Sequence, residues 1–195
     1  MAKGLSTGAK IGIGIAIFLV IGVLWFIGSY NGLVSKDETA NAAWADVEVQ
    51  YQRRFDLIPN LVNTVKGYAA HEEKLFTEIT ALRSQWQTAR TAGDVDGAIT
   101  AARGADSAIS RLLLVAENYP NLKASENFLS LQDELAGTEN RVAFSRNKYN
   151  DAVKIYSTAI RRFPTNIVAG MFGFDKKTLF EAQAGSETAP SVSFT

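Results

Sequence analysis

An uncharged stretch over residues 11–35 is the feature that most constrains how this chain can fold. Its 25 residues would extend about 38 Å as an α-helix, which exceeds the hydrocarbon thickness of a bilayer, about 30 Å. The densest part, residues 11–27, contains only apolar residues and glycine. We therefore predict a transmembrane helix over residues 11–35, preceded by a short basic segment over residues 1–10.

A cleaved signal peptide is the alternative interpretation, because a basic segment precedes the apolar stretch. The apolar core is longer than that of a typical signal peptide, and it ends in Trp25, Phe26 and Ile27, where a cleavage site needs small residues. The chain has no cysteine, which excludes a lipoprotein anchor. We expect the apolar helix to be retained as an N-terminal anchor in the lipid bilayer.

Charge predicts the orientation of this anchor. Lys3 and Lys10 precede the span, and Lys36 alone follows it closely. Because positively charged flanks tend to stay in the cytoplasm, we expect a cytoplasmic N-terminus and an extracytoplasmic soluble part. Beyond the span, 18 Lys and Arg residues balance 20 Asp and Glu residues, which argues against a nucleic-acid partner.

The first pattern after the span predicts one long amphipathic helix over residues 36–90. Polar residues lie between apolar residues that recur three or four positions apart. Pro59 lies inside the pattern and should kink or restart the helix, because proline lacks the backbone N–H. The helix then divides into a stalk over residues 36–58 and a bundle helix. Its apolar members are Ala40, Trp44, Val47, Tyr51, Phe55, Ile58, Leu61, Val62, Val65, Tyr68, Leu75, Ile79, Leu82, Trp86 and Ala89.

Two further helical patterns follow. Gly93 and Asp94 indicate a turn and an N-cap that begin a helix over residues 94–118, and the break at residues 118–121 precedes a helix over residues 124–163. No stretch shows sustained alternation typical of strands. We predict an all-α chain, in which one N-terminal transmembrane helix precedes an antiparallel three-helix bundle over residues 59–163.

Residues 164–195 are expected to form a C-terminal apolar patch and a flexible tail. The tail, from Ala184, is small and polar. Three roles for the patch remain open: it caps the bundle, contacts lipid headgroups or receives a partner. The apolar residues are Ile167, Val168, Met171, Phe172, Phe174, Leu179 and Phe180.

Two sets of residues are candidates for self-association. Gly8, Gly12 and Ala16 make a row of small residues that would let two spans approach closely. The stalk carries an apolar stripe that the helix over residues 94–118 is too short to cover, so either the overhanging helix over residues 124–163 or another subunit must cover it. That stripe is Trp44, Val47, Tyr51 and Phe55; core packing is the default role for such aromatic residues.

Catalytic and metal chemistry lack a motif in this sequence. His71-Glu72 begins like the zinc-protease signature, but Leu75 stands where the second histidine belongs and His71 is the chain's single histidine. Without cysteine, a Cys-His pair is impossible, and no serine has a nucleophile-elbow pattern around it. No phosphate-binding loop occurs. We expect no catalytic residue, no metal site and no cofactor.

Motifs along nearly the whole chain resemble those of the LemA family of bacterial membrane proteins. They include Tyr30-Asn31-x-Leu33-Val34, Ala43-Trp44, Arg53-Arg54-x-Asp56-Leu57-Ile58-Pro59-Asn60-Leu61-Val62, Val65-Lys66-Gly67-Tyr68-Ala69, His71-Glu72, Tyr119-Pro120-x-Leu122-Lys123-Ala124, Leu131-Gln132-x-Glu134-Leu135, Thr138-Glu139-Asn140, Tyr149-Asn150, Phe163-Pro164 and Gly173-Phe174. The resemblance implies a single-pass protein of the bacterial cell membrane with a soluble helical bundle. It implies no reaction, and it points to envelope proteins such as membrane metalloproteases as partners. Family descriptions that place the short N-terminus outside oppose the orientation predicted from charge.

Two functions agree with these observations. The first is a non-catalytic, membrane-anchored scaffold that self-associates and presents its bundle to other envelope proteins. The second is a peptide- or protein-binding adaptor, because residues 149–164 resemble one helix of a tetratricopeptide repeat. No second copy appears at the 34-residue period of that repeat.

Overall fold

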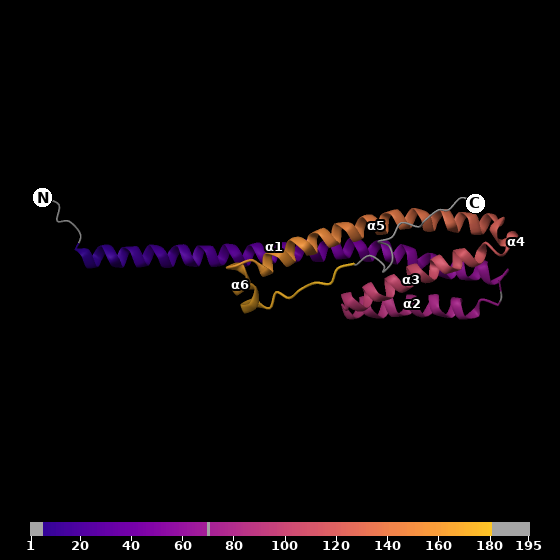
Figure 1. The fold of residues 1–195 in the computed structure, drawn as a ribbon, viewed down its shortest axis with the longest axis horizontal. Helices are drawn as coiled ribbons and strands as arrows, with labels where there is room; N and C mark the ends of the chain where they lie inside the picture. Colours follow the sequence, from indigo (N-terminus) through magenta and orange to yellow (C-terminus); the bar gives the residue numbers. More distant parts are fainter. Residues whose placement is uncertain (1–5, 70, 181–195) are drawn as a thin grey trace, which may run out of the picture. The chain divides into compact units, whose positions relative to one another are not determined.

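The computed structural model describes residues 6–69 and 71–180, and every regular element in them is helical. Figure 1 shows the helices in chain order. They are α1 (Thr7–Lys66), α2 (Glu73–Ala92), α3 (Val95–Ala116), α4 (Pro120–Lys123), α5 (Glu126–Arg161) and α6 (Thr165–Phe172). The predicted all-α class with one long apolar N-terminal helix is confirmed.

α1 is a single helix of 60 residues with Pro59 inside it. The helix continues past Pro59 because packing on both sides outweighs one missing backbone hydrogen bond. Phe55, Ile58 and Leu61 are all buried, and each such side chain contributes roughly 1.5–3 kcal/mol against a cost of about 3 kcal/mol for an interior proline. The chain therefore does not leave the helix at Pro59, where the stalk and the bundle helix were expected to separate.

The prediction of one helix over residues 36–90 is wrong between Lys66 and Glu73. The chain turns there: the amide groups of Tyr68 and Ala69 both donate to the carbonyl of Val65, at 3.0 and 2.8 Å. Gly67, a poor helix former, opens the turn, and burial of Ala69 fixes it. The bundle consequently has four long helical segments, from α1, α2, α3 and α5, and not three.

The other predicted helices are confirmed. α3 begins after Asp94, whose side chain accepts a hydrogen bond from the Gly97 amide at 2.9 Å, as an N-cap residue should. Gly93 before it has a φ of +70°, a conformation that glycine adopts without strain. α5 begins and ends within two residues of the predicted bounds.

The chain divides into two compact units, and α1 and α5 each contribute residues to both. Of the described residues, unit 1 comprises 6–42 and 151–177, and unit 2 comprises 43–69, 71–150 and 178–180. The tail predicted from Ala184 lies outside the described residues. In unit 1, a core of Leu33, Tyr156, Ile160, Val168 and Ala169 joins α1, α5 and α6.

The part of α1 before this core is long and apolar enough to span a membrane. Its most apolar window has a mean hydropathy of 2.7 and none of it is buried within the chain. Large side chains from Ile11 to Leu24 are exposed on every side of the helix. A helix that is apolar all round needs an apolar surrounding, which supports the predicted bilayer anchor.

Unit 2 is built around the second half of α1. α2 and α3 form an antiparallel pair beside it, and α5 runs along it in the opposite direction (Figure 1). Alanines along α3 let the helices approach closely, and large side chains from α1, α2, α3 and α5 fill the core. The largest buried side chains of this unit are Trp86, Tyr51, Tyr149, Phe55, Ile58, Leu61, Ile79, Ile99, Ile109 and Leu112.

Candidate functional site

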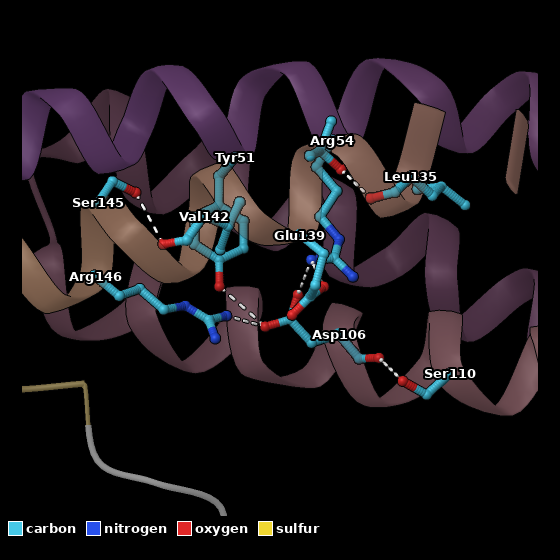
Figure 2. A network of polar contacts seen from close by, with 10 residues as sticks. Tyr51, Arg54, Asp106, Ser110, Leu135, Glu139, Val142, Ser145 and Arg146 are labelled. Atoms are coloured by element: carbon cyan, nitrogen blue, oxygen red, sulfur yellow. Dashed lines mark hydrogen bonds and ion pairs between the residues drawn. The ribbon is translucent and has the colours of Figure 1, made fainter. Parts of the chain in front are cut away.

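A network of charged side chains crosses the interior of unit 2. Asp106 of α3 lies at its centre and faces α1 and α5 (Figure 2). The Tyr51 hydroxyl donates to Asp106 Oδ2 at 3.0 Å, and Arg54 Nη1 lies 3.3 Å from Asp106 Oδ1. Arg146 donates to Asp106 Oδ2 from α5. One carboxylate therefore ties three helices together.

Arg54 extends the network to the surface. Its guanidinium, whose side chain is 6% exposed, also donates to Glu139 Oε2 on α5, and the Glu139 side chain is 52% exposed. Two guanidinium groups thus face two carboxylates, and their charges balance when both carboxylates are ionised. This balance matters because an unpaired charge in the interior costs several kcal/mol.

Burial shifts the acid–base behaviour of this network. It raises the pKa of Asp106 to about 7; Arg54 opposes the rise, and Glu139 adds to it. Burial also lowers the pKa of Arg146 to about 10. Both shifts have the same origin, since removal from water disfavours the charged form of any group.

Arg146 also lies against two aromatic rings. Its guanidinium carbon is 5.1 Å from the ring centroid of Tyr51 and 5.1 Å from that of Phe180. The Tyr51 and Phe180 rings are stacked, with centroids 6.2 Å apart and planes 9° apart. Cation–π contact of this kind stabilises a buried guanidinium, and it joins the ion network to the C-terminal segment.

α5 holds that C-terminal segment by its backbone. The Asn150 side-chain amide donates to the Phe180 carbonyl at 2.8 Å and accepts from the Phe180 amide at 2.9 Å. The Tyr149 hydroxyl donates to the Thr178 carbonyl at 2.9 Å, and burial raises the pKa of Tyr149 to about 12, so the hydroxyl keeps its proton. Such contacts recognise an extended chain whatever its side chains.

The stalk residues expected to associate with a second subunit are covered within the chain. Val47, Tyr51 and Phe55 are buried, and Trp44 is half-buried, with its ring 5.3 Å from Tyr149 and 6.0 Å from Phe180. Of the two arrangements considered for this stripe, the structure has the overhanging α5, with Phe180 filling the remaining space. Val47, Tyr51 and Phe55 are therefore covered within the chain, and Trp44 is covered in part.

The small-residue row lies elsewhere. Gly8, Gly12 and Ala16 are exposed in the apolar part of α1. A Cβ atom built on Gly8 or Gly12 would meet nothing within 4 Å, so neither glycine is required for packing inside the chain. His71, the remaining residue weighed for chemistry, is exposed in the turn before α2, and the described residues hold no cluster of three potential metal ligands.

Two open pockets in unit 2, each of about 370 Å³, are lined by residues of α1 and α5, and Arg141 lines both. We call the surface that these two pockets form the groove. Val49 and Phe144 are 52% and 72% exposed, and both line the first pocket. The first pocket is lined by Asp46, Val49, Gln50, Asn140, Arg141, Phe144, Ser145 and Lys148, and the second by Arg53, Asp56, Leu57, Glu134, Gly137, Thr138 and Arg141.

Two residues of the site were missed by sequence reasoning. Asp106 has a detectable signal: it stands on the buried face of α3, four positions after Ala102 and three before Ile109, where an apolar residue is expected. Asn150 has no signal in the helical pattern, because its partner is the backbone of Phe180; it stands out only as part of the Tyr149-Asn150 motif. Glu139 and Arg146 of α5 complete the network, through ion pairs with Arg54 and Asp106.

This chain matches one family model and is similar to several curated proteins. The model of the LemA family matches residues 43–194. Among curated relatives, Magnetosome protein MamQ 1 of Paramagnetospirillum magneticum is 27% identical over 88% of this chain and 73% of its own length. Magnetosome protein MamQ of Magnetospirillum gryphiswaldense is 26% identical over 87% of this chain and 71% of its own.

A third relative shows similarity over a still larger share of both chains. Protein LemA of Metamycoplasma hominis is 26% identical over 92% of this chain and 83% of its own length. The family match covers the helices that form unit 2, including α5 and the segment that Asn150 holds. The chain therefore belongs to the LemA family.

Proposed function

We propose that this chain is a non-catalytic, membrane-anchored helical scaffold that presents unit 2 to other envelope proteins. Its family, together with relatives such as MamQ, supports a membrane-associated protein. The exposed apolar part of α1 supports the anchor. The unit 2 network supports a rigid bundle, because one buried carboxylate on α3 contacts side chains of both α1 and α5.

The groove along α1 and α5 is the observation that carries the proposal. Phe144 and Val49 expose large apolar area between charged side chains such as Asp46 and Lys148. An apolar groove with a polar rim is typical of a surface that binds an amphipathic helix. We assign it to a helix of another envelope protein, and membrane metalloproteases are the class to which the family resemblance points.

The scaffold is oriented, in this proposal, with unit 2 outside the cytoplasm, as the lysines around the span suggest. A membrane-impermeant cross-linker that joins a thiol to an amine tests groove and orientation together. Because the chain has no cysteine, Phe144→Cys gives one reactive site in the groove. Leu114→Cys is the matched control, since Leu114 is equally exposed but lies on α3, outside the groove.

We expect intact cells to yield a cross-linked product with another envelope protein from Phe144→Cys and none from Leu114→Cys. Cross-linked products from both positions would contradict the assignment of the groove as the binding surface. So would the absence of product from both positions when both thiols are labelled. Thiols that react only after the cells are opened would contradict the orientation. Immunoblotting after electrophoresis distinguishes these results.

A peptide-binding adaptor is the second candidate, and the Asn150 contact favours it. The side-chain amide pairs with both backbone groups of Phe180, which is how a helical surface holds an extended peptide. In this chain its own C-terminal segment occupies the position. The adaptor function requires that segment to leave, so a segment that never exchanges with solvent would exclude it.

A further inference from the structure

α6 packs into unit 1 by one side alone. Val168 and Ala169 are buried there, together with Leu33 of α1 and Tyr156 of α5. These contacts fix α6 beside the apolar helix. They account for only part of its apolar surface, because the helix spans eight residues of sequence TNIVAGMF and none of them is charged.

The other side of α6 exposes large apolar side chains. Ile167, Met171 and Phe172 are 53%, 65% and 50% exposed. A helix that is apolar on both sides is typical of a protein interior or of a membrane. The Phe172 ring contacts Phe26 and Tyr30 of α1, whereas Ile167 and Met171 stay largely exposed within unit 1, so their surrounding must come from outside the unit.

The position of α6 along α1 indicates what surrounds its exposed side. The Phe172 ring centroid lies 5.9 Å from that of Phe26 and 4.7 Å from that of Tyr30. About 20 helical residues cross the hydrocarbon core, so a span that begins at Ile11 reaches its far edge near Tyr30. Phe172 therefore lies at the depth where aromatic side chains of membrane proteins gather.

Charges flank α6 in the manner of an interfacial helix. Arg161 and Arg162 precede it and Lys176 follows it, and all three are exposed. Asp175 is the one acidic residue among them. Long basic side chains reach from the interface to lipid phosphates while their apolar neighbours stay in the acyl region.

We propose that α6 lies in the interfacial layer of the bilayer, with Ile167, Met171 and Phe172 against the acyl chains. The chain then contacts the membrane twice, through the spanning helix and through a short helix that lies at the membrane surface. The second contact fixes the depth of unit 1. If α6 moved deeper, its flanking charges would enter the hydrocarbon; if it moved outward, its apolar side would be exposed to water.

Spin-label accessibility in vesicles tests this placement. The full chain is reconstituted into phosphatidylcholine–phosphatidylglycerol vesicles, and single cysteines are introduced by Ile167→Cys and Met171→Cys, at exposed positions that the fold tolerates. Val20→Cys, in the exposed apolar part of α1, is the lipid reference, and Phe144→Cys of unit 2 is the aqueous reference. Collision rates with molecular oxygen and with a water-soluble nickel complex are measured at each site.

We expect oxygen collisions to exceed nickel collisions at positions 167 and 171, as at position 20, and the order to reverse at position 144. Nickel collisions that dominate at both α6 positions would overturn the proposal, since α6 would then lie in water. Low rates with both reagents would overturn it too, since protein would cover α6. Frequent nickel collisions at position 20 would show that this part of α1 does not lie in lipid, and would contradict both the membrane anchor and the placement of α6.

Discussion

Asp106 shows how one residue can fix a bundle. Its carboxyl group accepts from Tyr51 and Arg146 and pairs with Arg54, so α1, α3 and α5 share a single polar centre. Apolar packing alone tolerates small rotations of helices, whereas these directional contacts favour the arrangement in which they form. The raised pKa of Asp106, about 7, is the consequence of placing that centre in the interior.

Replacing Arg54 by methionine tests this centre. Arg54→Met keeps most of the side-chain volume but leaves Asp106 and Glu139 without the cation they share. Because Arg146 still pairs with Asp106, we expect the free energy of unfolding at pH 8 to fall by about 1.5–3 kcal/mol, the range for hydrogen bonds to charged groups. Urea unfolding followed by circular dichroism measures it.

The loss of unfolding free energy in Arg54→Met should depend on pH. Because burial raises the folded pKa of Asp106 to about 7 from the ordinary 3.8, stability from its protonated form is present at low pH and is lost as pH rises through 7. Arg54 limits that loss. The Arg54→Met deficit should therefore be smaller at pH 5 than at pH 8.

Arg53→Met is the matched control, since Arg53 is exposed on the same turn of α1 and should change stability by less than about 0.5 kcal/mol. Equal losses from the two variants would mean that the network contributes nothing beyond a surface charge.

At the scale of elements, the C-terminal segment is held through Asn150. Asn150→Ala removes both hydrogen bonds to Phe180, each worth about 1 kcal/mol net. We expect hydrogen exchange of the Phe180 amide to become at least about tenfold faster, measured by mass spectrometry. Asn140→Ala, at an exposed position on the same helix, should leave the exchange unchanged. Unchanged exchange in Asn150→Ala would show that ring stacking alone retains the segment.

Helical elements were predictable here wherever a cap or a breaker marks their ends. Asp94 marks the start of α3, and the break before Pro120 separates α3 from α5. The turn after Lys66 was not predictable from spacing, because Leu75 follows Tyr68 by seven residues and so continues the helical period across a reversal of the chain. Gly67 is the one local signal of the turn, because glycine is a poor helix former.

The candidate site was predictable only in part, for a related reason. Periodicity gives the face on which a residue lies, so Glu139 and Arg146 could be expected at helix contacts. It does not give the partner across the bundle. Asp106 and Phe180 are distant from Arg146 in sequence, and only the packing of α3 and the return of the C-terminal segment bring them to it.

For the whole molecule, self-association is proposed to occur through the membrane span, since the stalk stripe is already covered. Gly12→Leu enlarges the row formed with Gly8 and Ala16, yet nothing in the chain lies within 4 Å of the added Cβ. Close approach of two spans needs small residues. We expect the mass of the detergent-solubilised protein, measured by light scattering, to fall in this variant.

Gly14→Leu is the control, because Gly14 is equally unobstructed but lies on another side of α1. A mass that is unchanged in Gly12→Leu, or that falls equally in both variants, would exclude the small-residue row as the contact.

The pairing of α1 with α5 also sets an order of events during synthesis. Asp46 and its partner Lys148 are separated by 102 residues, and Arg54 and Glu139 by 85. At about 5–20 residues per second, a ribosome needs several seconds or more to deliver the second helix after the first. During that delay the apolar stripe of α1 is available to chaperones and to neighbouring nascent chains, so biogenesis of this protein depends on what shields one helix until its distant partner emerges.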